Sequence, residues 1–398
     1  MHRLKGRVQH YSWGGDNYIP KLLSLQNPEK NPFAEYWLGV HHGGVSEVSL
    51  GHQGFTTLST LINSDKKRYL GEQVLSVFGT LPYLLKVLDV RDMLSIQVHP
   101  SRSAAEEGFK RENVAAIALD APNRNYKDTN HKPEVMVALS NDFWLLHGFR
   151  SDLTEKLTHF SFLTPFKAVF EDGGIIALFK YLMELPQEEV DCIFDPYAKE
   201  ILPKYLNAEI DRSSPDFWAA RMISKMAIRE EHYDRGIFTI YLLNIVHLKR
   251  GEGIFQGDGV PHAYLEGQNI ELMSNSDNVL RAGLTNKHVD IPELISNTNF
   301  VATCPVIMTG DLNKRLQEYK CPVPDFTLFS ACLKAGESQS FSKGFPRILI
   351  AIIGNGNCSG NQDILINSGD SIFIGADENF CITAEKDLLF FMASVPVM

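Results

Sequence analysis

The sequence predicts a mainly β protein that is interrupted by an all-helical insertion and ends in a second β region. Three observations predict this fold class. Short apolar runs separated by tight turns fill most of the first 100 residues, residues 151–234 change to helical spacing, and short strands return over 235–311 and 312–398. A chain of 398 residues is also too long for one ordinary core, so we expect several domains.

The best-marked strand of the first region is Leu94–His99. Side chains alternate along a strand, so Gln97 and His99 leave the same face. Pro100 ends the strand directly after them, which places the pair at the mouth of a barrel. Further strands are expected at Phe33–Gly39, Val45–Leu50, Val135–Leu139 and Phe143–Phe149.

The insertion carries the start signals and the spacing of helices. Ser151 offers a polar cap, and the apolar residues of Ile175–Leu185 recur at helical spacing. Ser214 caps a further helix that has Pro215 in its first position. We expect that helix to continue through Trp218–Arg229.

Strands resume after the insertion. Phe238–Leu248 alternates loosely and predicts one strand, and Lys249–Gly259 is rich in glycine turns. Beyond residue 312, short apolar runs separated by Gly, Asn and Asp turns predict a β-sandwich or a small barrel. Its strands are expected at Arg347–Ile353, Asp370–Ile374, Phe380–Thr383 and Leu388–Ala393.

The charge balance and the apolar runs argue against several classes of protein. The formal net charge is −10 and no block of Lys and Arg stands out, so we expect no nucleic-acid partner. The longest apolar runs, Ile348–Ile353 and Leu388–Val397, are far shorter than the ~20 residues of a membrane helix. Met1–Gly15 lacks the pattern of a signal peptide, and the six cysteines are scattered without a CxxC pair. We therefore expect a cytoplasmic protein with free thiols.

Four residues have the chemistry and the setting of metal ligands. Gln97 and His99 share a strand face, Glu134 precedes the apolar run Val135–Leu139, and His262 lies in a Gly-Val-Pro-His turn that aims its ring back into a barrel. A carboxylate that points into a core is costly unless it is paired or binds a cation. Two imidazoles, one carboxylate and one amide oxygen suit zinc, and they also accept cobalt, manganese or iron. These four residues therefore predict one divalent ion, zinc.

Around these residues the sequence resembles the type I mannose-6-phosphate isomerases (phosphomannose isomerases). The resemblance covers most of the chain and consists of several motifs in the same order. They are Tyr11-Ser-Trp13-Gly, Ala34-Glu35-Tyr-Trp37-Leu-Gly39, Leu84-Leu-Lys-Val-Leu88, Gln97-Val-His-Pro100, Asn130-His-Lys-Pro-Glu134, Gly259-Val-Pro-His-Ala-Tyr264, Asn269-Ile-Glu-Leu-Met273 and Asn275-Ser-Asp-Asn-Val-Leu-Arg-Ala-Gly-Leu-Thr285.

The resemblance implies a catalytic cupin (jelly-roll) barrel built from residues 1–150 and 235–311. It also implies a helical domain inserted over 151–234 and a degenerate cupin-like β domain over 312–398. The implied activity is the interconversion of mannose 6-phosphate and fructose 6-phosphate through a cis-enediol(ate), with one zinc per chain. The expected partner is a small sugar phosphate, and the chain is expected to be a monomer or a weak homodimer. The sequence differs from the family pattern after Pro100, where it has Ser101-Arg102 and many relatives have an acidic or amide residue followed by lysine. We expect this difference to alter contacts with the phosphate.

An aldose–ketose isomerisation needs a base for the carbon acid, groups that stabilise an enediolate, and an anchor for the phosphate. The metal polarises the sugar oxygens. Arg281 offers a planar fork of donors to enediolate or phosphate oxygens. Lys132 shares a face with Glu134 if that segment is extended, and Lys287 is a second candidate for the phosphate. Tyr264 either donates to a substrate hydroxyl or lines the barrel.

The base stays open among four candidates, which are His131, Asp277, Glu271 and metal-bound water. His131 is alternatively a loop residue that is hydrogen-bonded to backbone. Asp277 is alternatively a turn cap or a partner of Arg281. The pocket walls are expected to include Trp13 and Glu35.

Two patterns look functional but are set aside. His41 and His42 are adjacent, so on a strand they point to opposite faces and do not share one ion. The glycines of residues 251–259 lead into Pro-His and not into a helix that binds phosphate.

Two other functions remain as alternatives, a cupin oxidoreductase that uses iron and dioxygen, and a non-catalytic sugar-binding protein. The cations near the metal motifs favour a phosphorylated substrate. No histidine follows His288, so we predict a structural role for residues 312–398.

Overall fold

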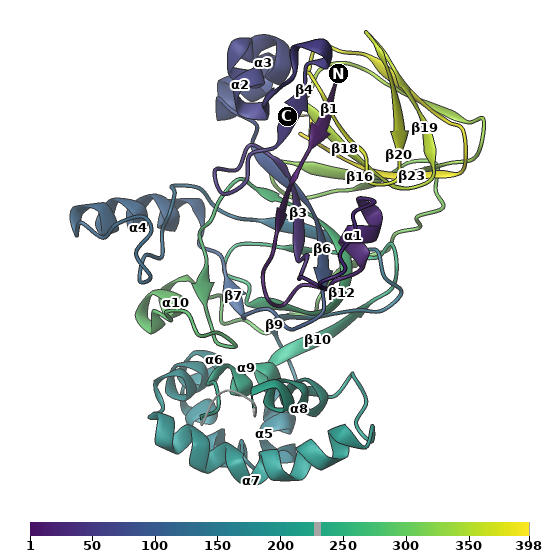
Figure 1. The fold of residues 1–398 in the computed structure, drawn as a ribbon. Helices are drawn as coiled ribbons and strands as arrows, with labels where there is room; N and C mark the ends of the chain where they lie inside the picture. The colour runs from purple at the N-terminus through teal and green to yellow at the C-terminus, as the bar shows by residue number, and fades with distance from the viewer. Residues whose placement is uncertain (227–231, 398) are drawn as a thin grey trace.

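The computed structural model describes residues 1–226 and 232–397. Figure 1 shows three parts in a row, with the C-terminal sheets at one end, a larger sheet in the middle and a helical region at the other end. This mixed architecture, with β-sheets and a helical insert, confirms the predicted fold class at that level.

The middle part is an eleven-stranded sheet in which β12 pairs on both sides. On one side β12 pairs with β7 and β6, and on the other with β9 and β8. The pairing with this one strand therefore fixes how the residues of the four other strands are aligned. His262 is the partner of Gln97, and Glu271 is the partner of Lys86. The strands are β2 (Arg7–Gln9), β3 (Glu35–Gly39), β6 (Tyr83–Val90), β7 (Gln97–Val98), β8 (Glu134–Ala138), β9 (Phe143–Phe149), β10 (Leu243–Leu248), β11 (Gly253–Gln256), β12 (His262–Ser274), β13 (Leu280–Arg281) and β14 (Ile307–Met308).

Two predicted strands of this part have different outcomes. The strand predicted at Phe143–Phe149 is confirmed by β9 at the same residues. The strand predicted at Leu94–His99 is too long, because only Gln97–Val98 pairs as β7, with β12 and β13.

The helical region follows β9 and packs around aromatic side chains. Trp218, Phe194, Phe238 and Tyr241 are all fully buried in its core. The helical insertion predicted from the sequence is therefore confirmed. Residues 227–229 of the predicted Trp218–Arg229 helix lie outside the described residues. The helices are α5 (Leu153–His159), η2 (Thr164–Phe166), α6 (Lys167–Glu184), α7 (Gln187–Leu206), α8 (Pro215–Met226) and α9 (Gly236–Leu242).

The strand predicted over Phe238–Leu248 is wrong in its first half. The structure forms α9 up to Leu242, and β10 begins at Leu243. Every residue of α9 is buried. A short segment that is apolar on all sides shows neither the helical nor the strand period, so the sequence pattern could not distinguish the two.

The C-terminal region forms an eight-stranded and a four-stranded sheet, with a hydrophobic core between them. The predicted strand Arg347–Ile353 coincides with β18, and β22 and β23 extend the predicted strands by one residue each. The strands are β15 (Gln317–Tyr319), β16 (Thr327–Leu333), β17 (Ser338–Phe341), β18 (Arg347–Ile353), β19 (Asn355–Ser359), β20 (Asp363–Asn367), β21 (Ser371–Ile374), β22 (Phe380–Ala384) and β23 (Leu388–Ser394).

The N-terminal segment contributes three strands to this C-terminal sheet. β1 (His2–Lys5) pairs with β21, and β4 (Glu47–Ser49) joins β1 to β5 (Phe55–Thr57). Figure 1 shows β1 and β4 beside the strands of the C-terminal region. Pairing over such a separation in sequence leaves no local pattern, so the division of the chain into residues 1–150 and 312–398 did not anticipate it.

The first 150 residues contain helices that the prediction of strands and turns missed. The longest are α3 and α4, and α4 buries only Ala105, Gly108 and Glu112. A helix without an apolar stripe has no periodicity to read. The remaining helices are α1 (Tyr18–Leu22), η1 (Gly51–Gln53), α2 (Leu58–Ser64), α3 (Lys66–Phe78), α4 (Arg102–Val114) and α10 (Ile291–Asn297).

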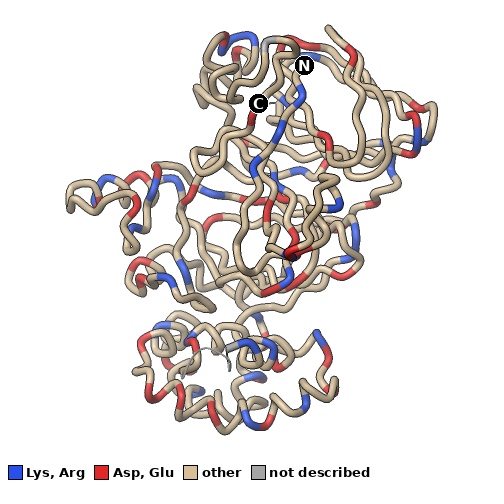
Figure 2. Tube along the Cα trace, in the orientation of Figure 1, with Lys and Arg blue, Asp and Glu red and all other residues tan. Residues whose placement is uncertain are grey.

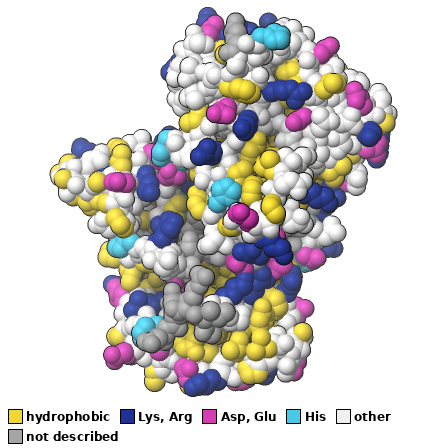
Figure 3. All heavy atoms as spheres, in the orientation of Figure 1, with side chains coloured by type: hydrophobic (Ala, Val, Ile, Leu, Met, Phe, Trp, Pro, Cys, Tyr) yellow, Lys and Arg dark blue, Asp and Glu magenta, His cyan; other side chains and the backbone are white. Residues whose placement is uncertain are grey.

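Charged side chains of both signs alternate along most of the chain (Figure 2). On the face drawn in Figure 3, Lys and Arg gather where the helical region meets the middle part. Within residues 1–226 and 232–397, no helix combines the length and the apolar character that crossing a membrane requires.

Candidate metal centre and substrate cavity

Two histidines and one glutamate converge in the core of the middle sheet. His99 directly follows β7, Glu134 begins β8 and His262 begins β12, and all three are buried. His99 Nε2 lies 3.3 Å from Glu134 Oε1, and His262 Nε2 lies 3.4 Å from Glu134 Oε2. The three ligand atoms lie within 4.8 Å of one another, as a shared ion requires.

The hydrogen bonds on the outer side of each ring fix which nitrogen carries the proton. His99 Nδ1 lies 2.8 Å from the carbonyl oxygen of Asn278, and His262 Nδ1 lies 2.8 Å from that of Val260. A carbonyl oxygen only accepts, so each Nδ1 carries its hydrogen and each Nε2 presents a lone pair. Neither Nε2 atom has a hydrogen-bond partner among the described residues.

The charges of this cluster favour a cation. Burial lowers the pKa of His99 to about 4, so its ring is neutral. Burial raises the pKa of Glu134, but Lys132 and the neighbouring rings outweigh it and hold this pKa well below the ordinary value, so the group is a carboxylate. Two lone pairs then face a carboxylate with no hydrogen between them, which is unfavourable unless a cation lies there. The residues therefore fit a divalent metal ion.

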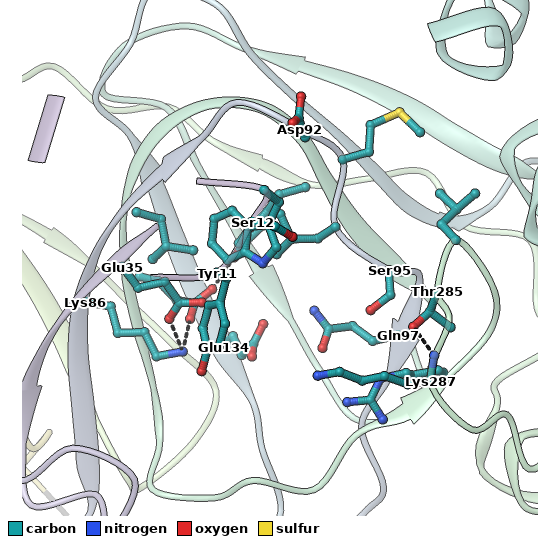
Figure 4. Close-up of a pocket in the computed structure, with 18 of the residues that line it drawn as sticks. Tyr11, Ser12, Glu35, Lys86, Asp92, Ser95, Gln97, Glu134, Thr285 and Lys287 are labelled. Atoms are coloured by element: carbon teal, nitrogen blue, oxygen red, sulfur yellow. Dashed lines mark hydrogen bonds and ion pairs between the residues drawn. The ribbon is translucent and has the colours of Figure 1, made fainter. Parts of the chain in front are cut away.

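The metal cluster opens on a cavity of about 810 Å³. Glu134 forms part of its wall, and His99 and His262 contact Glu134 without lining the cavity themselves. Figure 4 shows Glu35 and Lys86 on one side of this cavity, Thr285 and Lys287 on the other, and Glu134 and Gln97 between them. The residues predicted from the sequence that line the cavity are Trp13, Glu35, Gln97, Lys132, Glu134, Tyr264, Glu271, Asp277, Arg281 and Lys287.

Lys86 is a functional candidate that the sequence analysis missed. Its Nζ lies 2.9 Å from Glu271 Oε1 and 3.3 Å from Glu35 Oε2. Burial lowers the pKa of Lys86. The negative charges of Glu271, Glu35 and Glu134 outweigh this effect and raise the pKa far above the ordinary value of a lysine. The available signal was a lysine inside an apolar run that becomes the wholly buried strand β6.

Hydrogen bonds connect this ion pair to the metal cluster. The Tyr264 hydroxyl donates to Glu271 Oε2 over 2.7 Å. Gln256 Nε2 donates to the Tyr264 hydroxyl over 2.8 Å and lies 3.3 Å from Glu134 Oε2. Burial raises the pKa of Glu271. The positive charge of Lys86 lowers this pKa but does not cancel the effect of burial. Gln256 was also missed, because a glutamine in a glycine-rich stretch gives no pattern to read.

Asp277 meets both histidines of the His41-His42 pair. Its Oδ1 lies 3.2 Å from His41 Nε2 and its Oδ2 lies 3.0 Å from His42 Nε2. The expectation that these histidines point apart is wrong, because they lie in a turn after β3 and their rings stack with centroids 4.6 Å apart. Burial raises the pKa of Asp277, but the hydrogen bond from His41 and the charges around it outweigh this and lower it strongly.

The comparisons with known proteins place the chain in a family. The family model described as phosphomannose isomerase type I, catalytic domain, matches residues 1–152. The chain is 36% identical over 394 residues to the mannose-6-phosphate isomerase of Escherichia coli (strain K12), with 95% of this chain and 96% of the relative covered. The chain belongs to the type I phosphomannose isomerase family.

Other relatives extend this similarity to the whole fold. The chain is 31% identical over 420 residues to the mannose-6-phosphate isomerase of Homo sapiens, with 97% and 96% of the two chains covered. It superposes with a TM-score of 0.87 on the crystal structure of the Salmonella typhimurium enzyme bound to fructose 6-phosphate and zinc, at 34% identity and with 100% of both chains covered. A second solved structure, zinc-bound mannose 6-phosphate isomerase, gives 0.85 at 34% identity, with 100% of this chain and 99% of that chain covered.

Two residues were predicted to belong to the site from the phosphomannose isomerase motifs but do not line the cavity that the described residues form. They are Ser101 and His131. Ser101 caps α4, where its hydroxyl accepts the Ala104 N–H. His131 turns away to Asp325, with its Nε2 3.1 Å from Oδ2. Burial lowers the pKa of His131, but its contacts with Asp258 and Asp325 outweigh this and raise it to about 9. A ring that is protonated at neutral pH and lies outside the cavity is unsuited to be the base, so that prediction is corrected.

The cations predicted for this phosphomannose isomerase site do face the cavity. Lys132 Nζ lies 3.1 Å from Glu134 Oε1. Arg281 lies opposite Gln97 in the pairing of β13 with β7. Lys287 shares the cavity wall with Arg281, and burial and then the charge of Arg281 lower the pKa of Lys287. The alternative that Asp277 pairs with Arg281 is not what the structure forms, because Asp277 contacts His41 and His42.

Proposed function

We propose that this chain is a zinc-dependent isomerase that interconverts D-mannose 6-phosphate and D-fructose 6-phosphate. The observation that carries the proposal is the buried cluster of His99, Glu134 and His262. Its Nε2 atoms have no hydrogen-bond partner within residues 1–226 and 232–397, and its carboxylate lines a cavity that Lys132, Arg281 and Lys287 also line. Relatives named mannose-6-phosphate isomerase at 31–37% identity, aligned along nearly the whole chain, support it.

We propose that the middle sheet is the catalytic cupin barrel predicted for residues 1–150 and 235–311. In this proposal residues 151–234 form the helical domain, and residues 312–398 form a second cupin-like domain. The two-sided pairing of β12 and the full-length superposition on related enzymes support this division. Strands β1, β4 and β5 complete the C-terminal sheet.

In this proposal Gln97, His99, Glu134 and His262 hold one zinc per chain. When bound, zinc supplies a Lewis acid that polarises the sugar oxygens and acidifies the adjacent C–H. Gln256 supports Glu134 from behind, because its amide lies within hydrogen-bonding distance of the carboxylate. Such an outer contact holds a ligand in place.

Glu271 is the base in this proposal. It lines the cavity, and burial raises its pKa above the ordinary value, which strengthens a carboxylate as a base. It would take the proton from C2 of mannose 6-phosphate and return it to C1, while the hydroxyl proton moves from O2 to O1, so that C1 becomes the alcohol and C2 the carbonyl. Lys86 holds one oxygen of Glu271 and keeps its own proton. Asp277 has a lowered pKa, so it serves as a fixed negative charge and not as a base.

Arg281 and Lys287 divide the anionic groups of the substrate between them. Arg281 donates to the enediolate, because it lies beside Gln97 at the metal end of the wall. Lys287 binds the phosphate at the wall that Figure 4 shows with Thr285 and Ser95. Lys132 adds a third positive charge beside Glu134. These cations favour a sugar phosphate over the substrates of an iron and dioxygen oxidoreductase.

The proposal is tested with purified protein in a coupled assay of fructose 6-phosphate formation from mannose 6-phosphate. Activity should be lost with a chelator and restored by zinc. Full activity in the chelated protein would overturn the metal role, and a zinc-loaded protein without isomerase activity would overturn the function. A monomeric state and a cytoplasmic location stay predictions, and size-exclusion chromatography with light scattering checks the first.

A further inference from the structure

We propose that Asp234 is a positioning residue that holds the segment 284–287 at the phosphate end of the substrate cavity. This inference rests on the proposed function. It assigns to the end of the helical insertion an indirect role in binding the substrate, through the segment 284–287 that Asp234 holds.

One carboxylate accepts three backbone hydrogen bonds at this position. Asp234 Oδ1 accepts the N–H of Gly236 over 2.6 Å and that of Leu284 over 2.9 Å. Asp234 Oδ2 accepts the N–H of Thr285 over 2.9 Å. Successive backbone N–H groups that point to one side form a concavity suited to an anion, and Asp234 supplies that anion from within the chain.

The backbone that Asp234 holds is in an unusual conformation. Gly283 has φ +112° and Leu284 has φ +56°, so a non-glycine residue lies in the left-handed region directly after a glycine that also has positive φ. A non-glycine residue keeps this unfavourable backbone conformation only where contacts with its surroundings stabilise it. The two N–H groups after Gly283 are the ones that Asp234 accepts, so its carboxylate supplies these contacts.

The segment also borders two cavities. Leu284, Thr285, Asn286 and Lys287 line the substrate cavity of about 810 Å³. Three of them, Thr285, Asn286 and Lys287, also line a second cavity of about 390 Å³ on which Asp234 itself borders. Thr285, Asn286 and Lys287 border both cavities, and the two backbone hydrogen bonds to Asp234 hold the segment where it leaves Gly283.

Two glycines let the end of the insertion reach the segment. A Cβ on Gly283 would lie 2.2 Å from the Cα of Gly236, and a Cβ on Gly236 would lie 2.5 Å from the backbone nitrogen of Leu284. Both distances are far below a real contact, so the two backbones touch directly. This contact brings Asp234, two residues before Gly236, within hydrogen-bonding distance of the segment.

Arg281 is held independently of Asp234. It belongs to β13, which pairs with β7, and the next residues exchange hydrogen bonds with Ile96. Loss of the Asp234 contacts should therefore displace Lys287 and Thr285 while Arg281 stays in place. An interaction that serves ground state and transition state alike changes KM and leaves kcat unchanged.

The test compares Asp234→Asn and Asp234→Ala in the zinc-loaded enzyme. Asparagine keeps one acceptor but turns an NH₂ group toward Thr285 N–H, and alanine removes all three contacts. For Asp234→Asn we expect KM for mannose 6-phosphate to rise about tenfold, as one lost hydrogen bond to a charged group predicts, with kcat within about twofold of wild type. Asp234→Ala should raise KM further. Inhibition by inorganic phosphate should weaken by the same factor as KM rises.

Asp191→Asn is the matched control. Asp191 accepts the backbone N–H of the neighbouring Tyr233 over 2.9 Å and belongs to the same helical region, but it does not line the substrate cavity. We expect this variant to keep the wild-type KM. Melting temperatures of all variants separate a local effect from unfolding.

An unchanged KM in folded Asp234→Ala would overturn the inference, as would a fall in kcat at constant KM. If Asp234→Ala does not fold, Asp234→Asn alone decides, with the same two outcomes. If wild-type protein shows no isomerase activity, the proposed function fails. Calorimetric titration with inorganic phosphate then still tests Asp234, because weaker binding by Asp234→Asn than by Asp191→Asn supports the positioning role and equal binding contradicts it.

Discussion

Two clusters of two histidines and one carboxylate lie around the same cavity, and they differ in where their ring protons lie. In the cluster of His99, Glu134 and His262, each Nδ1 donates to a backbone carbonyl. The Nε2 atoms therefore carry lone pairs and face a carboxylate without a proton between them. That arrangement calls for a cation.

The cluster of His41, His42 and Asp277 has the opposite arrangement at His41. There the backbone N–H of Gly43 donates to Nδ1 over 3.1 Å, so the proton of the neutral ring lies on Nε2, which faces Asp277. In both clusters the ligand atoms lie within 4.8 Å of one another. Residue type and proximity alone therefore do not define a metal site, because the hydrogen bond on the far nitrogen decides it.

The largest expected effect comes from Glu134→Gln. The change removes the charged ligand of the proposed site, so zinc content should fall and turnover should drop by roughly 10³-fold or more, the rate equivalent of several kcal/mol of Lewis-acid stabilisation. Metal analysis and the coupled assay check both. Asp277→Asn is the control and should retain one zinc per chain, and loss of zinc from that variant would reverse the comparison of the two clusters.

Arg281→Lys should have the second-largest effect. Lysine keeps the charge but loses the planar pair of donors, and loss of a preorganised donor costs roughly 10²–10³-fold in kcat. Steady-state kinetics at full zinc occupancy measure it, and KM should change much less. A near-normal kcat with a raised KM would assign Arg281 to the phosphate and not to the enediolate.

Variants of His41 sharpen the assignment of its proton. His41→Leu removes the hydrogen bond that holds the negative charge of Asp277 in the cavity wall. Because the lost contact is a buried hydrogen bond to a charged group, we expect kcat to fall about 10–100-fold. His41→Gln can still donate and should recover most of this activity. His42 is 72% exposed, so His42→Ala serves as control and should have little effect. Equal kcat losses in His41→Leu and His41→Gln would argue against a donor role.

His131 adds a third arrangement, a cationic ring, and gives the smallest expected effect. Burial and the charge of Arg102 lower the pKa of His131, but the contacts with Asp258 and Asp325 outweigh them. The pKa therefore rises from 6.5 to about 9 in the folded protein. A raised pKa stabilises the fold fully below about pH 6.5, and this stabilisation is lost as pH rises through 9. The melting temperature should therefore fall by a few degrees from pH 6.5 to pH 9.5, and Asp325→Asn should flatten this trend. An identical slope in wild type and Asp325→Asn would contradict it.

Local residue patterns predicted the metal cluster but not its neighbourhood. Glu134 ahead of an apolar run and His262 after a glycine turn are visible in sequence because burying a charge is costly. Lys86 is equally buried, but its partners Glu35 and Glu271 come from β3 and β12, so the sequence shows no pair. The positions of partners across a sheet depend on strand register.

The fold shows the same limit. Strands with distinct apolar runs, such as β9 and β18, were predicted at their true residues. His41 and His42 were misread because alternation was applied to a turn, where it does not hold. The Asp234 contact was not predictable, since it joins residues about 50 positions apart through two glycine backbones.

Anomalous scattering from crystals of the zinc-loaded protein tests the comparison most directly. We expect one zinc per chain, bound by Gln97, by the Nε2 atoms of His99 and His262 and by the Glu134 carboxylate, and no zinc between His41, His42 and Asp277. The same preparation should lose isomerase activity when the zinc is removed. A zinc ion at His41, His42 and Asp277, with none at His99, Glu134 and His262, would contradict the account.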